Sequence, residues 1–207
     1  MIELYLSALA TFFVVIDPPG CAPIYAGLTA GASAAQRRSM AIRAVAVAAI
    51  ILFVFAAVGE AILRALGVSL SAFRIAGGIM LFLIALEMVF EKRTERREDR
   101  AAKVAQTPDV VDVSIFPMAM PMIAGPGSIA SVMLTMSHNH GVQRVAVVLA
   151  ALATILVLTL AALLAAGPLM RLLGAKIEAV ITRILGVLLA ALAVQFVIDG
   201  VKIALGV

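Results

Sequence analysis

The stretch VVIDPPGCAPIYAG, from Val14 to Gly27, lies inside the first long apolar run of the chain. It contains an aspartate, three prolines and two glycines. Proline has no N–H and clashes with the preceding turn, so a regular helix does not continue through Pro18, Pro19 and Pro23. In a membrane, such a break survives only where protein buries it or where it lines a water-filled cavity. The stretch therefore predicts a broken helix, and the rest of the sequence has to explain what the break is for.

The composition predicts an integral membrane protein. Of the 207 residues, 64 % are hydrophobic and 14 % are charged, whereas a soluble domain is nearer to half apolar and a quarter charged. The net charge of +4 comes mostly from loops between apolar runs, which the positive-inside rule explains without a nucleic-acid partner. Residues 1–4 lack the basic start of a cleavable signal peptide, and the single cysteine, Cys21, excludes an internal disulfide.

Six segments are long and apolar enough to cross a bilayer, which takes roughly 20 residues. The first is interrupted by the quoted stretch and the fourth by PMIAGPGS, Pro121 to Ser128. Because these two segments are longer than one straight span needs, each is predicted to be two half-helices joined by an irregular break near the membrane midplane. The six segments are about Leu4–Ala35, Met40–Leu66, Ser71–Phe90, Val110–Ser137, Val142–Ala166 and Ile177–Ile203.

The basic residues predict the orientation. Loops after the first, third and fifth segments carry eleven Lys and Arg residues, and the other side carries three. The positive-inside rule therefore predicts that the first group of loops is cytoplasmic and that both termini are extracytoplasmic. The larger group is Arg37, Arg38, Arg43, Lys92, Arg93, Arg96, Arg97, Arg100, Lys103, Arg171 and Lys176, and the smaller is Arg64, Arg144 and Lys202.

The two halves of the chain resemble each other. At a shift of 107 positions, LATFFVVIDPPG (9–20) aligns with FPMAMPMIAGPG (116–127), and Gln36-Arg37 aligns with Gln143-Arg144. At shifts of 109 and 108, RIAG (74–77) aligns with RILG (183–186), and ALE (85–87) aligns with AVQ (193–195). Three spans in each half is an odd number, so the halves are predicted to have opposite orientations, as in many secondary transporters.

The predicted fold is therefore an all-α membrane protein with six transmembrane helices in two inverted three-helix repeats. It forms a single transmembrane domain over residues 1–207. Repeat one covers about 1–90, a cytoplasmic linker covers about 91–109, and repeat two covers about 110–207.

The two breaks are the candidate binding site, because interrupted segments at corresponding positions mark the midplane site of inverted-repeat transporters. A half-helix that begins after a break offers free N–H groups and a positive dipole end, which suit a carboxylate. Asp17 suits a cation, such as a substrate ammonium group, a proton or Na⁺. An acid inside a membrane is a functional hypothesis by default. The alternatives are that the breaks are only kinks, and that Asp17 forms a buried ion pair with Arg74 or Arg183.

Further polar residues in the spans are candidates. Arg74 and Arg183 occupy corresponding places near the starts of the third and sixth segments, where an arginine either reaches the interface or faces the core. Gln195 lies in the middle of the sixth segment, where its amide bonds either another helix or a substrate. Ser128 is a candidate to supply a hydroxyl at the second break, and the alternative is that it only packs between helices, as serine often does in membranes. His138-Asn139-His140 has no carboxylate or thiol close by in the sequence, so no metal or other cofactor is expected.

The motifs together resemble the MarC family of bacterial and archaeal inner-membrane proteins, over essentially the whole chain. The resemblance rests on DPPGCAPIY (17–25), FPMAMPMIAGPGSI (116–129) and TRILGVLLAALAVQFVIDGV (182–201). It implies a six-span protein related to the LysE-type exporter superfamily, and some members are assigned as transporters of small neutral amino acids. The residues that match the family pattern are Asp17, Pro18, Gly20 and Pro23, then Pro121, Gly125, Pro126 and Gly127, and finally Arg183, Gly186 and Gln195.

Two positions depart from the family pattern: Pro19 is an extra proline beside the usual one, and Cys21 is the departure that matters for binding. The family usually has an asparagine directly after the first glycine, and Cys21 stands there in this chain. A thiol is a weaker hydrogen-bonding group than an amide. If the asparagine contacts substrate in the family, the specificity of this chain is expected to differ.

The function predicted is a secondary transporter or exporter of a small polar solute, in particular a small neutral amino acid, coupled to H⁺ or Na⁺. The site residues are Asp17, Pro18, Gly20, Cys21, Pro23, Gly125, Pro126, Gly127, Ser128, Arg74, Arg183 and Gln195. The alternatives are an ion or metal transporter or channel on the same scaffold, and a non-transporting membrane partner. An enzyme is not expected, because no Ser-His or His-Glu-x-x-His arrangement is present. A homo-oligomer stays open, since lipid-facing and partner-facing apolar surfaces look alike in sequence.

Overall fold

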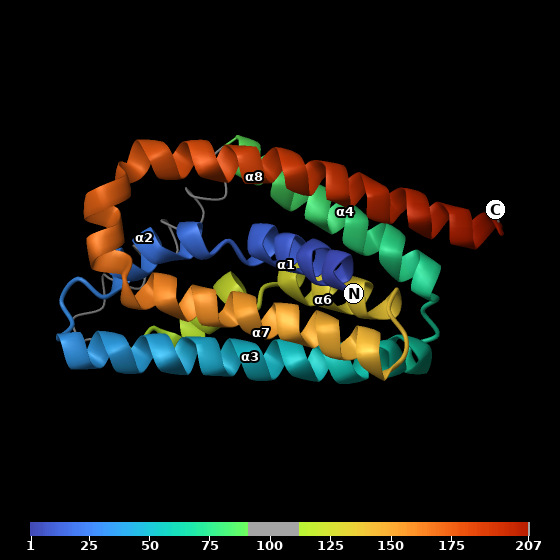
Figure 1. The fold of residues 1–207 in the computed structure, drawn as a ribbon, viewed down its shortest axis with the longest axis horizontal. Helices are drawn as coiled ribbons and strands as arrows, with labels where there is room; N and C mark the ends of the chain where they lie inside the picture. The colour runs from blue at the N-terminus through green and yellow to red at the C-terminus, as the bar shows by residue number, and fades with distance from the viewer. Residues whose placement is uncertain (91–111, 207) are drawn as a thin grey trace.

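The structure, a computed structural model, describes residues 1–90 and 112–206, without the side chains of residues 168–179. The regular structure of this part of the chain is entirely helical (Figure 1). The predicted linker at about 91–109 and the side chains of Arg171 and Lys176 lie outside the described residues. The elements are α1 (Ile2–Ile16), α2 (Pro18–Leu28), α3 (Ala34–Ala65), α4 (Leu70–Val89), η1 (Ser114–Ile123), α6 (Pro126–Ser137), α7 (Val142–Leu164) and α8 (Ala166–Leu205).

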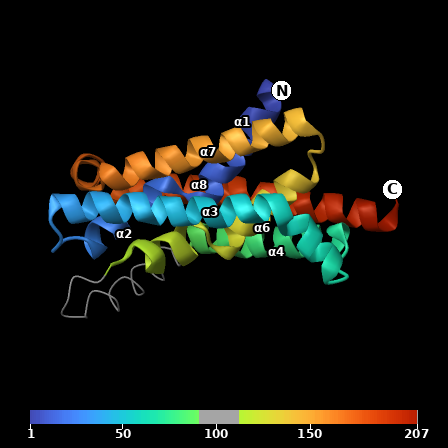
Figure 2. The same ribbon diagram turned by 90° about the horizontal axis from the view of Figure 1, so that it is seen from below.

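The described residues hold five helical segments that are long and apolar enough to cross a membrane, or six when one bent pair is included. The first of the five joins α1 and α2, Ile2–Leu28, across the break at Asp17. The bent pair is η1 and α6, whose axes differ by 51°. The sequence predicted interruptions at these two places, and the structure confirms both. The helices run roughly along the longest axis of the molecule, as Figures 1 and 2 both show.

Two helix starts differ from the prediction. Helix α3 begins at Ala34 rather than near Met40, because Ser33 and Gln36 form a capping box that satisfies donors of its first turn. Helix α8 begins at Ala166 rather than near Ile177, so Pro168 lies in its first turn instead of opening a loop. A proline in the first turn of a helix removes an N–H that has no helical partner anyway, and it is therefore compatible with a helix start there.

Helices α4 and α8 form the tightest pair, and they run antiparallel along the top of Figure 1. Glycines allow the close approach. A β-carbon at Gly78 would lie 2.8 Å from the carbonyl oxygen of Ala193, and one at Gly186 would lie 3.1 Å from the carbonyl oxygen of Ala85. Small residues at such an interface let the two backbones approach, which is the usual way that helices associate in a membrane.

The two ends of the bundle are distinguished by their turns. One end of the bundle, at the left of Figure 1, holds the turn at residues 29–33 and the junction of α7 with α8 at Ala165. It is called the linker end because α4, which the predicted linker follows in the sequence, runs toward it. The opposite end, at the right, holds the turns at residues 66–69 and 138–141. The broken segment α1–α2 packs mainly against α7, and the broken segment η1–α6 packs mainly against α3 and α4. Each broken segment therefore packs mainly against helices of the other half of the chain.

Candidate functional site

The first break is centred on Asp17, whose side chain is almost completely buried, with 1 % of its surface exposed. Its backbone is left-handed, with φ 59° and ψ 65°, a conformation that aspartate adopts more readily than most residues. Its N–H bonds the carbonyl of Phe13 and ends α1. Its carboxylate Oδ1 accepts the Gly20 N–H at 3.1 Å and begins α2. Asp17 is thus at once the C-cap of one half-helix and the N-cap of the next.

This geometry changes what the first break offers to a ligand. In a continuous helix, the carbonyls of Val14, Val15 and Ile16 would accept N–H groups from the residues four positions on. Pro18 and Pro19 have no N–H, and the Gly20 N–H is donated to Asp17. These carbonyls therefore lose their usual helical donors at the negative end of α1, beside a carboxylate. The first break therefore places the Asp17 carboxylate at the negative end of α1. The Gly20 N–H, which was expected to face a substrate carboxylate, is donated to Asp17 instead.

The Cys21 side chain contacts the backbone at the first break. Its side chain is fully buried, and its Sγ lies 3.5 Å from the carbonyl oxygen of Ile16, in hydrogen-bonding geometry. A thiol is a weak donor, but this contact supplies a partner to a carbonyl that has lost its helical donor. Pro23, two residues on, has no N–H to give to the carbonyl of Pro19, so the opening of α2 also lacks one helical bond.

The second break is built differently. Gly125 is the N-cap of α6, in extended conformation, and no side chain caps the helix. Pro126 occupies the first helical position and has no N–H, so the first free donors are those of Gly127 and Ser128. Ser128 is buried, with 4 % exposed. The helix start, with its positive dipole end and uncapped N–H groups, is the kind of place where proteins hold anionic groups.

The structure brings the two breaks together. A β-carbon at Gly127 would lie 2.5 Å from Cδ1 of Ile84 on α4 and 3.7 Å from Cγ1 of Val15 on α1. Val15 is two residues before Asp17, so the start of α6 packs against the end of α1. The site residues Asp17, Gly20, Gly127 and Ser128 therefore belong to one buried region between the halves of the chain.

Arg74 lies elsewhere, at the opposite end of the bundle. It is buried, with 6 % exposed, and its Nη2 donates to the carbonyl oxygen of Ser137 at 3.3 Å and to Oγ of the same residue at 3.4 Å. Its Nε is buried and has no hydrogen-bond partner among the described residues. Asp199 is close enough for its charge to act on the guanidinium. Arg74 therefore ties α4 to the end of α6 instead of joining Asp17.

The other two polar candidates lie on the outer face of α8. Arg183 is exposed, in the half of the helix nearer the linker end, and Gln195 is exposed, ten residues before the end of the helix at Leu205. The Gln195 Nε2 donates to Oδ1 of Asp199 at 2.8 Å, one turn further along. The sequence left a partner helix and a substrate as the alternatives for this amide, and in the structure it bonds its own helix.

Cavities in the described part of the chain were not predicted from the sequence, and two of them lie at opposite ends of the bundle. The larger, of about 470 Å³, opens at the linker end between α2, α3 and the α7–α8 junction, and is called the linker-side cavity. The smaller, of about 180 Å³, opens at the opposite end between α3, α6 and α7, and is called the far-side cavity. Pattern alone could not place them, because each is lined by residues from three separated parts of the chain. The linker-side cavity is lined by Tyr25, Ala26, Thr29, Ala34, Arg37, Arg38, Leu163, Leu164, Ala166 and Gly167.

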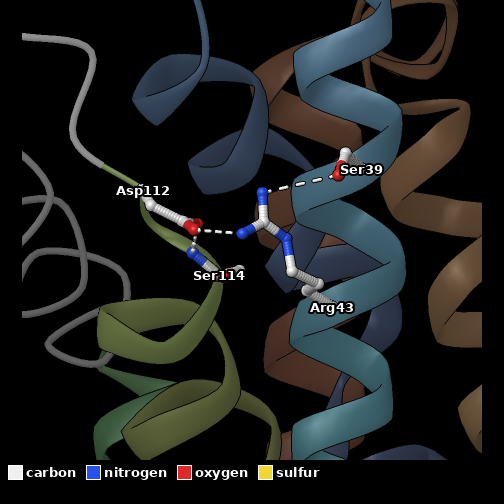
Figure 3. Close-up of polar contacts among 4 residues, drawn as sticks. All are labelled: Ser39, Arg43, Asp112 and Ser114. Carbon is white, nitrogen blue, oxygen red and sulfur yellow. Dashed lines mark hydrogen bonds and ion pairs between the residues drawn. The ribbon is translucent and has the colours of Figure 1, made fainter.

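A polar contact fixes the start of η1 to α3 (Figure 3). Arg43 Nη1 lies 2.7 Å from Oδ2 of Asp112, and Arg43 Nη2 donates to Oγ of Ser39 at 3.4 Å. The other carboxylate oxygen of Asp112 accepts the Ser114 N–H at 3.0 Å. Hydrogen bonding by Ser114 lowers the pKa of Asp112, partial burial opposes this, and the positive charge of Arg43 lowers it further. The sequence signal for this clasp is an aspartate two residues before a serine at a helix start.

The fold and the site define a class of protein, namely a multi-pass helical membrane protein with two buried helix breaks. The model of the MarC family of integral membrane proteins matches residues 2–205. The chain belongs to this family, as its motifs indicated.

Related sequences cover nearly all of the chain. A UPF0056 membrane protein of Archaeoglobus fulgidus is 36 % identical over 96 % of this chain and 92 % of its own length. One from Methanocaldococcus jannaschii is 34 % identical over 99 % of this chain and 98 % of its own length. The UPF0056 membrane protein YhcE of Escherichia coli is 31 % identical over 96 % of this chain and 92 % of its own length. No solved structure matches the chain.

Proposed function

We propose that the protein is a secondary transporter of a small zwitterionic solute, in the class of small neutral amino acids, and that it works by alternating access between two inverted repeats. The single observation that carries the proposal is the chemistry of the paired breaks. One presents the Asp17 carboxylate at the negative end of α1, and the other presents the uncapped start of α6. A solute with an ammonium group and a carboxylate has a complement for each.

The reciprocal packing of α4 and α8 supports the inverted repeat. At a shift of 108 positions, Gly78 corresponds to Gly186 and Ala85 corresponds to Ala193. Gly78 packs on the carbonyl of Ala193, and Gly186 packs on the carbonyl of Ala85. Such an exchange of equivalent contacts is what a two-fold axis between the halves produces.

The two cavities support alternating access. At a shift of 107 positions, seven of the ten residues that line the linker-side cavity correspond to residues that line the far-side cavity. These two corresponding cavities open toward opposite ends, and the linker-side cavity is more than twice as large as the far-side cavity, as expected for a two-repeat transporter described in one of its two states. The corresponding pairs are Ala26 and Met133, Thr29 and Met136, Ala34 and Gly141, Arg38 and Val145, Leu163 and Ala56, Leu164 and Ala57, and Gly167 and Glu60.

The proposal includes an orientation. The linker end carries Arg37, Arg38 and Arg43, and the positive-inside rule assigns it to the cytoplasm, with both termini outside. The larger cavity is then the cytoplasmic one. In this scheme Asp17 binds the ammonium group or carries a coupling H⁺ or Na⁺, the start of α6 binds the carboxylate, and no step is catalytic.

The test is uptake and counterflow of labelled glycine, alanine and serine in proteoliposomes, with and without a proton or sodium gradient. The wild type is compared with Asp17→Asn, and with Glu3→Gln as a control, because Glu3 is an exposed acid in the first turn of α1. Uptake by the wild type and the control, and none by Asp17→Asn, supports the proposal. Cation flux without amino-acid flux supports an ion transporter instead. No flux of any kind supports a non-transporting partner protein.

A further inference from the structure

The linker-side cavity contains positive charge that the described protein does not neutralise. Arg37 and Arg38, from the first turns of α3, both line it. In the described part of the chain, no carboxylate forms an ion pair with Arg37 or Arg38. The described residues that line the cavity include no acid. An oxyanion is therefore the ligand whose charge fits it.

The backbone that carries the two arginines is held by buried contacts. The Tyr25 side chain is 2 % exposed, and its hydroxyl donates a hydrogen bond to the carbonyl oxygen of Arg37. Thr29, 1 % exposed, donates its own hydroxyl to the carbonyl of Tyr25 at 2.7 Å. These bonds hold the start of α3 against the end of α2, so the backbone that carries both guanidinium groups is set before any ligand arrives.

The volume of the cavity and its other lining residues limit which anionic ligands fit. A volume of about 470 Å³ lies within the range of small-molecule sites, and it exceeds what a bare ion fills. Leu163 and Leu164 supply an apolar wall from the end of α7. Planar guanidinium groups recognise phosphate through paired N–H donors. A basic pocket between helices at the level of the lipid headgroups is a known type of site for anionic lipid.

We propose that the linker-side cavity is a phosphate site in which Arg37 and Arg38 bind the phosphate group, carried either by the headgroup of an anionic lipid or by free phosphate. The site is separate from the paired breaks and does not depend on transport. The far-side cavity serves as a comparison for the linker-side cavity within the same protein. It occupies the corresponding place in the second repeat, but the described residues that line it include Glu60 and His140 and no arginine.

The test measures lipid and phosphate binding to the purified full-length protein. Native mass spectrometry in a neutral detergent compares phosphatidylglycerol with phosphatidylcholine, and calorimetry with inorganic phosphate forms the second arm. The variant is Arg37→Gln with Arg38→Gln. The matched control is Arg64→Gln with Arg144→Gln, because both residues are exposed near the opposite end and Arg144 aligns with Arg37. Thermal unfolding in phosphatidylcholine verifies that both double variants are folded.

We expect the wild type and the control to bind phosphatidylglycerol in preference to phosphatidylcholine, and the Arg37/Arg38 variant to lose about thirtyfold in that preference. If inorganic phosphate binds in a way that depends on the arginine pair, and phosphatidylglycerol does not, the cavity is still a phosphate site. Its ligand is then free phosphate rather than a lipid headgroup. Equal binding of both lipids by the wild type together with no phosphate binding overturns the proposal. An equal loss in the control variant also overturns it, because it would show that any arginine pair suffices.

Discussion

At the first break, the Asp17 carboxylate bonds the backbone of Gly20 and occupies the space where a side chain at position 20 would lie. The Asp17 Oδ1 accepts the Gly20 N–H at 3.1 Å, and a β-carbon at position 20 would lie 2.2 Å from Oδ2 of the same carboxylate. The buried carboxylate can keep this position only because residue 20 has no side chain. The break thus depends on a glycine for space rather than for an unusual backbone angle.

Gly20→Ala is therefore expected to displace the Asp17 carboxylate. A methyl group forced into a packed interior typically costs about 1–3 kcal/mol of the free energy of unfolding. We expect a lower unfolding temperature in detergent and, if the proposed transport holds, uptake close to that of Asp17→Asn. The measurements are thermal unfolding and proteoliposome uptake.

Gly27→Ala is the control for Gly20, in the same helix. A β-carbon at Gly27 would have no atom within 4 Å, and the residue is exposed. Alanine is favoured over glycine in a helix by about 1 kcal/mol, so this variant should be as stable as the wild type or more so. If Gly20→Ala behaves like Gly27→Ala, then the carboxylate is not held as the structure describes.

The α4–α8 pair makes a second prediction. A β-carbon at Gly78 would lie 2.8 Å from the Ala193 carbonyl oxygen and 3.0 Å from the Val197 nitrogen, both backbone atoms that a side-chain rotation cannot move. Gly78→Ala is therefore expected to push the helices apart and to cost about 1–3 kcal/mol. Unfolding by titration with a denaturing detergent measures the change. Gly31→Ala, at a turn where nothing lies within 4 Å, should change stability by about 0.5 kcal/mol or less. An unchanged Gly78→Ala would contradict the close packing.

The breaks could be predicted from the sequence because proline and glycine act locally. The missing N–H groups of Pro18 and Pro19 exclude a continuous helix whatever surrounds them. The same property of proline explains why the predicted start of α8 was too late. Proline ends a helix, but it is also compatible with the first turn of a new helix, and Pro168 lies in the first turn of α8.

The positions of the polar side chains could not be predicted from the sequence as well as the breaks could. Whether Arg74 reaches the breaks or the end of α6 depends on where α4 lies in the bundle. The sequence does not indicate this position, because a helix with apolar residues on every face has no distinct side that must face the core. For Gln195 a local signal was present, because Asp199 stands four positions on, the spacing at which helical side chains meet. The linker-side cavity needs three distant segments together, and no pattern within one of them predicts it.

His138, in the turn after α6, makes a prediction about pH. Partial burial lowers its pKa below the ordinary value, the charge of Arg74 lowers it further, Asp199 opposes this, and His140 adds the least lowering. Because the pKa is lower in the folded protein, the contribution of His138 to stability is complete above the ordinary pKa of about 6.5. It is lost as the pH falls from there through the lower, folded pKa. Asp199→Asn should lower the pKa of His138 further, and proton NMR of the imidazole measures it.

The control for His138 is His140→Gln, which should raise the pKa of His138 only slightly. The His138 ring also meets the ring of Phe196 edge to face, with centroids 6.2 Å apart, so Phe196→Leu is expected to alter the shift through burial rather than through charge. A pKa of His138 that does not respond to Asp199→Asn would contradict the proximity of the two groups.

The clasp between Arg43 and Asp112 makes the last prediction. Both side chains are about half exposed, 55 % and 45 %, so solvent screens the pair, and its loss should cost under about 1 kcal/mol. The pKa of Asp112 is lowered first by hydrogen bonding from Ser114 and then by Arg43. A lowered carboxyl pKa means that the contribution is complete above the ordinary value of about 3.9 and is lost as the pH falls through the lower, folded value.

Carbon NMR of the Asp112 carboxyl should follow this transition. Arg43→Gln should raise the pKa of Asp112 only in part, because the backbone N–H of Ser114 still donates to Oδ1 of the carboxylate at 3.0 Å. If Arg43→Gln instead returns the pKa to its ordinary value, charge rather than hydrogen bonding holds the carboxylate, and the clasp depends on Arg43 more than on the start of η1.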